Sequence, residues 1–143
     1  MAYVDADLVI HSMSEYQVVN KELEKYQAKL VQKLEAEKKS IAVFYTDVID
    51  EVKKGVLSPK EQENAQKELQ EKQEKLEELK HSINLLLLQK EKELSHPLYL
   101  KFEAILKKVA QDKKIDLILD EKFLHFGSQK KDLTNLVLKY INS

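Results

Sequence analysis

The side chains in this sequence that could do chemistry are four histidines and a group of carboxylates near the C-terminus. Asp116, Asp120 and Glu121 could act as an acid/base pair, but acidic residues that flank a short apolar strand are usually solvated. No two histidines have the spacing of metal ligands on one helix, and none lies in an HExxH-type motif; the four are His11, His81, His96 and His125. The sequence also lacks a Ser–His–Asp signature and a glycine-rich phosphate loop. We therefore expect no catalytic residue, no metal site, no cofactor and no enzymatic activity.

Composition argues against nucleic-acid-binding, disulfide-stabilised and membrane-spanning classes of protein. The 143 residues carry 24 basic side chains, all of them lysine, and 25 acidic ones, for a net charge of -1. A surface that follows phosphates needs a basic excess on one face, so we expect no nucleic-acid partner. Cysteine is absent, which excludes disulfides and thiolate sites. Apolar runs such as Leu85 to Leu88 are far shorter than the roughly 20 residues that span a bilayer, so we expect no stable membrane insertion.

Most of the chain must run in long helices, because only two glycines and two prolines interrupt it. From Ser14 to about Lys53, apolar residues recur at gaps of three, four or seven, which is typical of a coiled-coil seam. Near the end of this segment the expected seam residues are Ile41, Tyr45, Val48 and Val52. A second pattern of this kind runs from Pro59 to about Ser95, with polar residues at two seam positions, Gln62 and Lys72.

A tip turn is expected at residues 54–58, between the two helices. Gly55 can take the left-handed conformation that closes the first helix, and Ser58 can cap the second helix, with Pro59 at its first position. Glu61 completes a capping box with Ser58. Residues 14–96 are therefore predicted to form a long antiparallel coiled-coil hairpin.

The remaining residues, 1–13 and 97–143, predict a small α/β base, so that the whole fold is mainly α with a little β structure. Short helices are expected after Asp7 and Asp132, which would cap them. Pro97 lacks the backbone N–H that a helix needs, so we expect the helix to break or kink there. Strand patterns occur at Ala2–Asp5, Ile115–Asp120 and Phe123–Phe126. Short strands with open edges need partners, so we expect the base to be an oligomerisation hub.

This layout, with particular residues of the base, resembles the Skp (OmpH-like) family of periplasmic chaperones. The matching stretches are Tyr3-Val4-Asp5, the run from Ala110 to Asp120, and Asp132-Leu133-Thr134 followed by Val137-Leu138. The resemblance implies a homotrimer in which three bases form a shared β hub and three hairpins, the tentacles, surround a cavity. It also implies ATP-independent holding of unfolded outer-membrane or periplasmic proteins in the periplasm. No signal peptide is present, and Met1-Ala2 is interpreted as an expression start placed on a mature N-terminus.

Two sets of residues are expected to carry this function. The oligomerisation set comprises the apolar residues of the expected strands: Tyr3, Val4, Ile115, Leu117, Ile118, Leu119, Leu124 and Phe126. The client-binding set comprises apolar residues off the seam: Val31, Val43, Phe44, Leu85, Leu87 and Leu88. Four consecutive leucines cannot all face one seam, because each residue turns by about 100°; packing near the base is the alternative for them.

Well-known members of the resembled family are strongly basic, whereas this chain is nearly neutral, so we expect apolar contact to dominate client binding. Two other functions stay open from the sequence. A prefoldin-like cytosolic chaperone subunit also combines helical tentacles with a β base. A structural coiled-coil spacer or adaptor would need only the hairpin.

Overall fold

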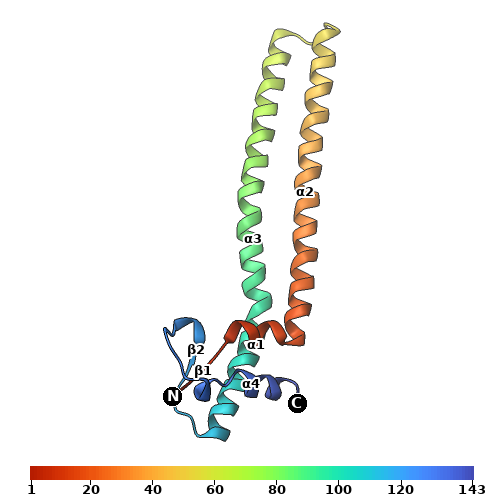
Figure 1. The fold of residues 1–143 in the computed structure, drawn as a ribbon. Helices are drawn as coiled ribbons and strands as arrows, with labels where there is room; N and C mark the ends of the chain where they lie inside the picture. The colour runs from red at the N-terminus through yellow and green to blue at the C-terminus, as the bar shows by residue number, and fades with distance from the viewer. The chain divides into compact units, whose positions relative to one another are not determined.

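The computed structural model describes all 143 residues, which form two compact units (Figure 1). The base unit comprises residues 1–23 and 90–143, and the hairpin unit comprises residues 24–89. Two long helices, α2 (Ser14–Lys53) and α3 (Pro59–Lys113), contribute residues to both units. The mainly helical fold with one small sheet confirms the fold class predicted from the sequence.

Within the hairpin unit, α2 and α3 run antiparallel and are joined at one end by a short turn (Figure 1). Ile83 is the one residue of this unit that is buried, and most of the other seam residues are half-buried, among them Leu34, Ile41, Leu69, Leu76 and Leu79. Tyr45 and Val52, which were also expected on the seam, are exposed. A seam between two helices shields each side chain on only part of its surface. Its stability therefore comes from many partial burials along the helices. No helix of the protein is both long and apolar enough to cross a membrane.

The tip turn closes α2 with a Schellman motif. The backbone N–H of Val56 donates to the carbonyl of Glu51, and that of Gly55 to the carbonyl of Val52, at 3.2 and 3.1 Å. Gly55 has the left-handed φ of 70° that this motif requires, as predicted. Helix α3 then begins at Pro59, and the Ser58 hydroxyl accepts a hydrogen bond from the backbone N–H of Glu61 at 3.1 Å. The predicted cap at Ser58 is therefore confirmed.

The base unit is built on two short parallel strands, β1 (Ala2–Val4) and β2 (Ile118–Asp120), with Tyr3 opposite Leu119. On its other side β1 is bridged by the chain at Asp132, where the backbone N–H of Leu133 donates to the Tyr3 carbonyl at 2.8 Å. Helices α1 (Ala6–Ser12) and α4 (Thr134–Ile141) pack with α3 around this sheet. The buried core comprises Val4, Val9, Ile10, Met13, Leu98, Phe102, Val109 and Val137.

Two local expectations about the base were wrong. Residues 123–126 form no strand, because the Asp120 carboxylate accepts a hydrogen bond from the Lys122 backbone and turns the chain into a 3-10 helix, η1 (Glu121–Phe123). A second 3-10 helix, η2 (Gln129–Lys131), follows. The cap of α1 is Asp5 instead of Asp7, since the Asp5 carboxylate accepts from the Leu8 N–H at 3.2 Å.

Helix α3 also does not break at Pro97, which lies inside it. A proline in a helix interior costs about 3 kcal/mol, because it removes a hydrogen bond and clashes with the preceding turn. Leu98, which directly follows Pro97, and Phe102, about one turn further along α3, are buried in the core of the base. Their packing offsets the cost of the proline and keeps the backbone helical across it.

Candidate functional site

One edge of the small sheet in the base is open. The Leu117 carbonyl accepts from the Ala2 N–H at 2.9 Å, so the polar backbone groups of Leu117 point toward β1. Successive residues of a strand direct these groups to opposite sides, which places those of Ile118 on the edge away from β1. The sheet has two strands, and no third strand pairs with this edge. An open edge of this kind can accept a strand from another chain.

Exposed apolar side chains lie in the same part of the base. Phe123 and Phe126 are 75% and 88% exposed, and Met1 and Leu117 are also exposed. A shallow groove of about 260 Å³ is lined mainly by Met1, Tyr3, Leu119, Leu124, Phe126 and Gly127. Two phenylalanines this exposed are unusual on a small domain, since exposed apolar patches tend to mark contact surfaces. We call this groove with the open edge of β2 the base surface.

The residues expected to mediate oligomerisation divide into two kinds. Phe126 is exposed on the base surface, Leu119 and Leu124 are half-buried in its groove, and Ile118 is half-buried at its open edge; Leu117, directly before β2, is also exposed. Val4 is only 1% exposed and packs in the core of its own subunit, so it can affect an interface only by shaping β1. The expected set also includes two residues of intermediate or low exposure: Ile115 is half-buried at the end of α3 and Tyr3 is buried.

Tyr3 holds the loop that forms one wall of the base surface. Its ring packs against Gly127, where an added Cβ would lie 2.6 Å from the ring, and its hydroxyl donates to the Gly127 carbonyl at 3.4 Å. Burial, together with the nearby carboxylates of Asp132 and Glu121, raises the pKa of Tyr3. The phenol is therefore neutral and able to donate this hydrogen bond at physiological pH.

A polar network joins the N-terminal strand to the C-terminal helix. The buried Thr134 hydroxyl donates to the Asp132 carboxylate at 2.6 Å and accepts from the Asp5 backbone N–H at 3.0 Å. The Asp132 carboxylate also accepts from the Thr134 backbone N–H at 3.0 Å. The bond between Asp5 and Thr134 joins residues more than one hundred positions apart in the chain, and it fixes the end of β1 against the start of α4. The N-cap of α4 is Leu133, without a side-chain cap hydrogen bond, so Asp132 does not cap the terminal helix as expected but binds Thr134 at its start.

An ion pair links α2 and α3 within the base. The Lys101 ammonium group contacts the Glu15 carboxylate, and this hydrogen bond is the main reason why the pKa of Glu15 lies below its usual value. Both side chains are substantially exposed, so the pair contributes little to stability. Its role is to hold the first turn of α2 beside α3.

Most residues expected to bind clients are exposed on the hairpin unit. Leu85 and Val43 are 62% and 52% exposed, and Val31 and Leu88 are also exposed. Leu87 is half-buried, as is its neighbour Leu86 on the predicted seam. The four consecutive leucines are therefore divided between the seam and the surface, as their helical spacing requires.

The expectation that Phe44 lies off the seam was wrong. Phe44 is half-buried and faces α3, where the Lys72 ammonium lies 5.2 Å from its ring centroid, while Tyr45 is exposed. Both residues fit a heptad pattern between Ile41 and Val48, because gaps of three then four and of four then three are equally regular. The packing of the partner helix decides between them, and the sequence of α2 alone could not.

Near the tip turn, the seam of the hairpin opens into a groove of about 310 Å³. Its walls come from both helices and include Phe44, Tyr45, Val48, Val52, Ala65 and Leu69. We call this the tip groove. Sequence reasoning missed it, although the small side chain of Ala65 at a seam position and the polar Gln62 one turn before it were the available signals.

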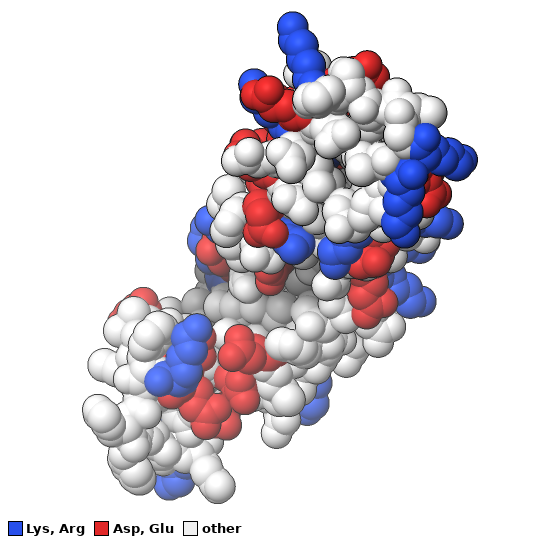
Figure 2. Space-filling model, turned by 90° about the horizontal axis from the view of Figure 1, so that it is seen from above, with Lys and Arg blue, Asp and Glu red and all other residues white.

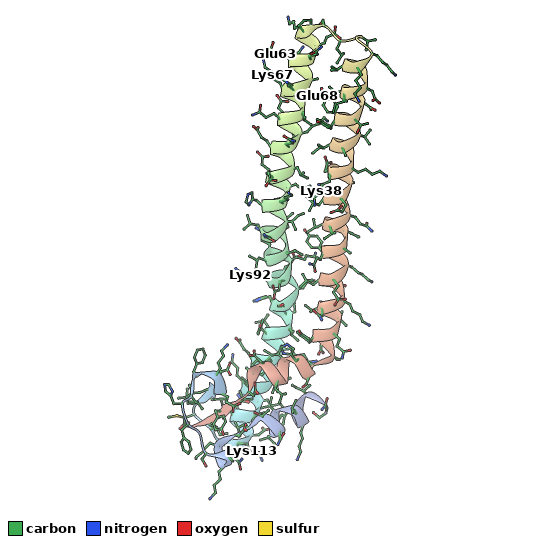
Figure 3. All side chains as sticks on the ribbon, turned by 45° about the horizontal axis from the view of Figure 1, so that its top comes forward. Lys38, Glu63, Lys67, Glu68, Lys92 and Lys113 are labelled. Carbon is green, nitrogen blue, oxygen red and sulfur yellow. The ribbon has the colours of Figure 1, made fainter.

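Charges of both signs are mixed along the hairpin. Figure 2 shows lysines and acids interspersed with uncharged surface on the face that it draws. The ion pairs of this unit join residues three or four apart on one helix, such as Glu63 with Lys67 at 3.7 Å, which Figure 3 shows near the tip of α3. Such pairs stabilise a solvated helix face only slightly and form no single-sign surface. No cluster of three or more side chains is placed to hold a metal ion.

Comparison with known proteins agrees with the resemblance seen in the sequence. Among solved structures, a chain of Caulobacter crescentus provisionally described as an outer membrane chaperone (OmpH-like) matches with a TM-score of 0.83 and 14% identity. The match covers 99% of this chain and 82% of that one, and at this identity it shows a shared fold. No curated protein matches in sequence. The model of the family described as outer membrane protein (OmpH-like) matches residues 1–141, so this chain belongs to the OmpH-like family.

Proposed function

We propose that this protein is an ATP-independent holdase chaperone of the periplasm, which keeps unfolded outer-membrane or periplasmic proteins from aggregating. The family match over residues 1–141 and the chaperone description of the Caulobacter structure support this class of function. The observation that carries the proposal is a long hairpin that keeps several large aliphatic side chains exposed, while lysines and acidic residues are mixed along its sequence. Weak apolar contacts repeated along a surface can hold an unfolded chain without fixing its structure.

The client surface is proposed to include Val31, Val43, Leu85 and Leu88, all exposed on the hairpin unit. Each half-exposed aliphatic side chain can lose only part of its remaining surface to a client, so a single contact contributes less than the roughly 1.5 to 3 kcal/mol of full burial. Several such contacts together would retain a client, and each can break rapidly. Phe44 and Leu87 serve mainly the seam, because both are half-buried there.

A light-scattering assay tests this function. An unfolded outer-membrane protein is diluted from urea with and without the chaperone, and the wild type should suppress its aggregation, whereas a coiled-coil spacer would not. Val43→Ser combined with Leu85→Ser should weaken the suppression without changing helix content. Val18→Ser is the matched control, since Val18 is equally exposed on α2 but belongs to the base unit.

The dependence on salt separates apolar from electrostatic capture. Between about 50 and 500 mM salt the Debye length falls well below 10 Å, so capture by exposed charges would weaken steeply. Because the charges of the hairpin are balanced, we expect the suppression of aggregation to change only slightly with salt concentration. Full activity of the Val43/Leu85 double variant together with a steep loss in salt would contradict the proposal.

We further propose that the protein assembles through the base surface as a homotrimer. The open edge of β2 and the exposed Phe123 and Phe126 support self-association there. Leu117→Asp combined with Phe126→Asp should give monomers on a sizing column with light-scattering detection, because it places charges in the contact. The control is Leu100→Asp, because Leu100 lies on α3 and is about as exposed as Leu117. This variant should leave the mass of the assembly unchanged. An assembly of unchanged mass from the double variant would count against this surface.

A further inference from the structure

The tip groove is an apolar slot that the hairpin itself does not fill. Among the seam residues of α3, Leu69 and Leu76 carry large side chains, but Ala65, which lines the groove together with Val48, has only a methyl group. The resulting space of about 310 Å³ lies at the lower end of the size range of ligand pockets. Two aromatic residues, Phe44 and Tyr45, form part of its wall. A flat ring entering this slot would have both aliphatic and aromatic partners.

The ammonium of Lys72 lies over the ring of Phe44, which forms part of the wall of the tip groove. Lys72 occupies a seam position, is half-buried, and holds its ammonium 5.2 Å from the centroid of the Phe44 ring. No carboxylate lies within ion-pair distance of this ammonium, whereas Lys38, Lys67 and Lys80 each pair with a glutamate three or four residues away. The stem of a half-buried lysine lies along apolar surface while its ammonium stays accessible, so the charge of Lys72 can reach an incoming carboxylate. The groove therefore combines an apolar slot with an unpaired cation.

We propose that the tip groove binds an aromatic side chain of an unfolded client whose neighbouring residue is Asp or Glu. The ring fills the space beside Ala65, and the adjacent carboxylate pairs with Lys72. Aromatic walls and a cation already stacked on Phe44 favour an incoming ring over an aliphatic side chain. The charge of Lys72 favours a segment with an acid beside that ring. This inference rests on the proposed holdase function and adds a local sequence preference to it.

Short peptides test the preference directly. The chain contains no tryptophan, so the emission of a peptide tryptophan reports binding without interference. The probes are two hexapeptides, Gly-Ser-Trp-Asp-Ser-Gly and Gly-Ser-Trp-Asn-Ser-Gly, with blocked termini and at low salt. The wild type should bind the aspartate peptide up to about fivefold more tightly, as expected for one partly exposed ion pair. Lys72→Met, which keeps an apolar stem at the seam, should bind the two peptides equally.

Filling the groove provides the second arm. Ala65→Leu should weaken binding of both peptides about tenfold or more, because the ring loses its site of burial. Ala36→Leu makes the same change at an exposed position of α2 and should leave both affinities unchanged. Circular dichroism checks that each variant keeps its helix content. Lys72→Met keeps the inference testable if Ala65→Leu does not fold.

The outcomes distinguish this inference from the proposed function. Suppression of aggregation by the wild type, measured on the same preparation, tests the holdase activity itself. Unchanged peptide binding by Ala65→Leu, or an unchanged aspartate preference in Lys72→Met, would overturn the groove proposal even where the wild type suppresses aggregation. A lower assembly mass for Ala65→Leu would show that a second copy of the chain covers the groove, and this too would overturn it.

Discussion

Replacing Leu98 by alanine should destabilise the base unit by about 2 to 5 kcal/mol, the usual range for a buried leucine that leaves a cavity. Leu98 is 4% exposed and belongs to the core that α3 forms with α1, α4 and β1. It also follows Pro97 directly, so the same contacts hold the helix through the proline. The loss should fall in the upper half of the range, because a helix fixed on several sides cannot move to close the cavity.

The matched control is Leu100→Ala. Leu100 lies two residues further along α3 and is 52% exposed, so its truncation removes little buried surface. We expect a change within about 0.5 kcal/mol for this variant. The measurement is urea unfolding followed by circular dichroism at a fixed protein concentration, since self-association would make the midpoint depend on concentration. Hydrogen exchange assigns the loss to the base unit, where the amides of residues 98–109 should lose protection.

The role assigned to Pro97 is tested in the same background. Pro97→Ala should stabilise the protein by up to about 3 kcal/mol, because it restores an N–H donor and removes the clash with the preceding turn. In combination with Leu98→Ala it should recover part of the lost free energy of unfolding. Two results would refute the argument that core packing holds the helix against the proline. One is an equal loss of unfolding free energy in Leu98→Ala and Leu100→Ala, and the other is no gain in unfolding free energy from Pro97→Ala.

Three further changes test other parts of the base. Lys114 closes α3 with a left-handed φ of 54°, which is strained for a residue with a side chain, so Lys114→Gly should raise the free energy of unfolding by about 1 kcal/mol in urea titrations. Gly127→Ala places a methyl group 2.6 Å from the ring of Tyr3, and it should cost about 1 to 3 kcal/mol and alter the mass of the assembly by displacing the loop. The hydrogen bond to Asp112 raises the pKa of Tyr140 above its usual 10.0, so its stabilising effect is complete below that pH and is lost as the pH rises through the raised value. Tyr140→Phe should therefore make stability fall less steeply above that pH in thermal melts, and an identical pH profile would contradict this assignment.

The hairpin and its turn could be predicted because they depend on patterns that act within a few residues. The 3.5-residue spacing of apolar residues, Gly55 in the turn and the cap at Ser58 each act within a few residues, so the hairpin and its tip followed from the sequence. The strands at Ala2 and Ile118 were also expected, since short apolar runs beside turns favour strands. Leu117 and Phe126, which were expected to mediate oligomerisation, are both exposed, and their role in an interface stays a prediction.

The hairpin, its capped turn, the mixed charge and the mainly α class with a small base could thus be predicted from the amino-acid sequence. The helical conformation at Pro97 could not, because the energy that holds it comes from contacts of Leu98 and Phe102 with distant segments of the chain. Only the packing of two helices decided that Phe44 faces the seam and that Ala65 leaves a groove open beside it. A heptad pattern limits which residues can face a partner helix. The choice between adjacent candidates, such as Phe44 and Tyr45, depends on the shape of the partner helix. That shape is set by residues far away in the chain.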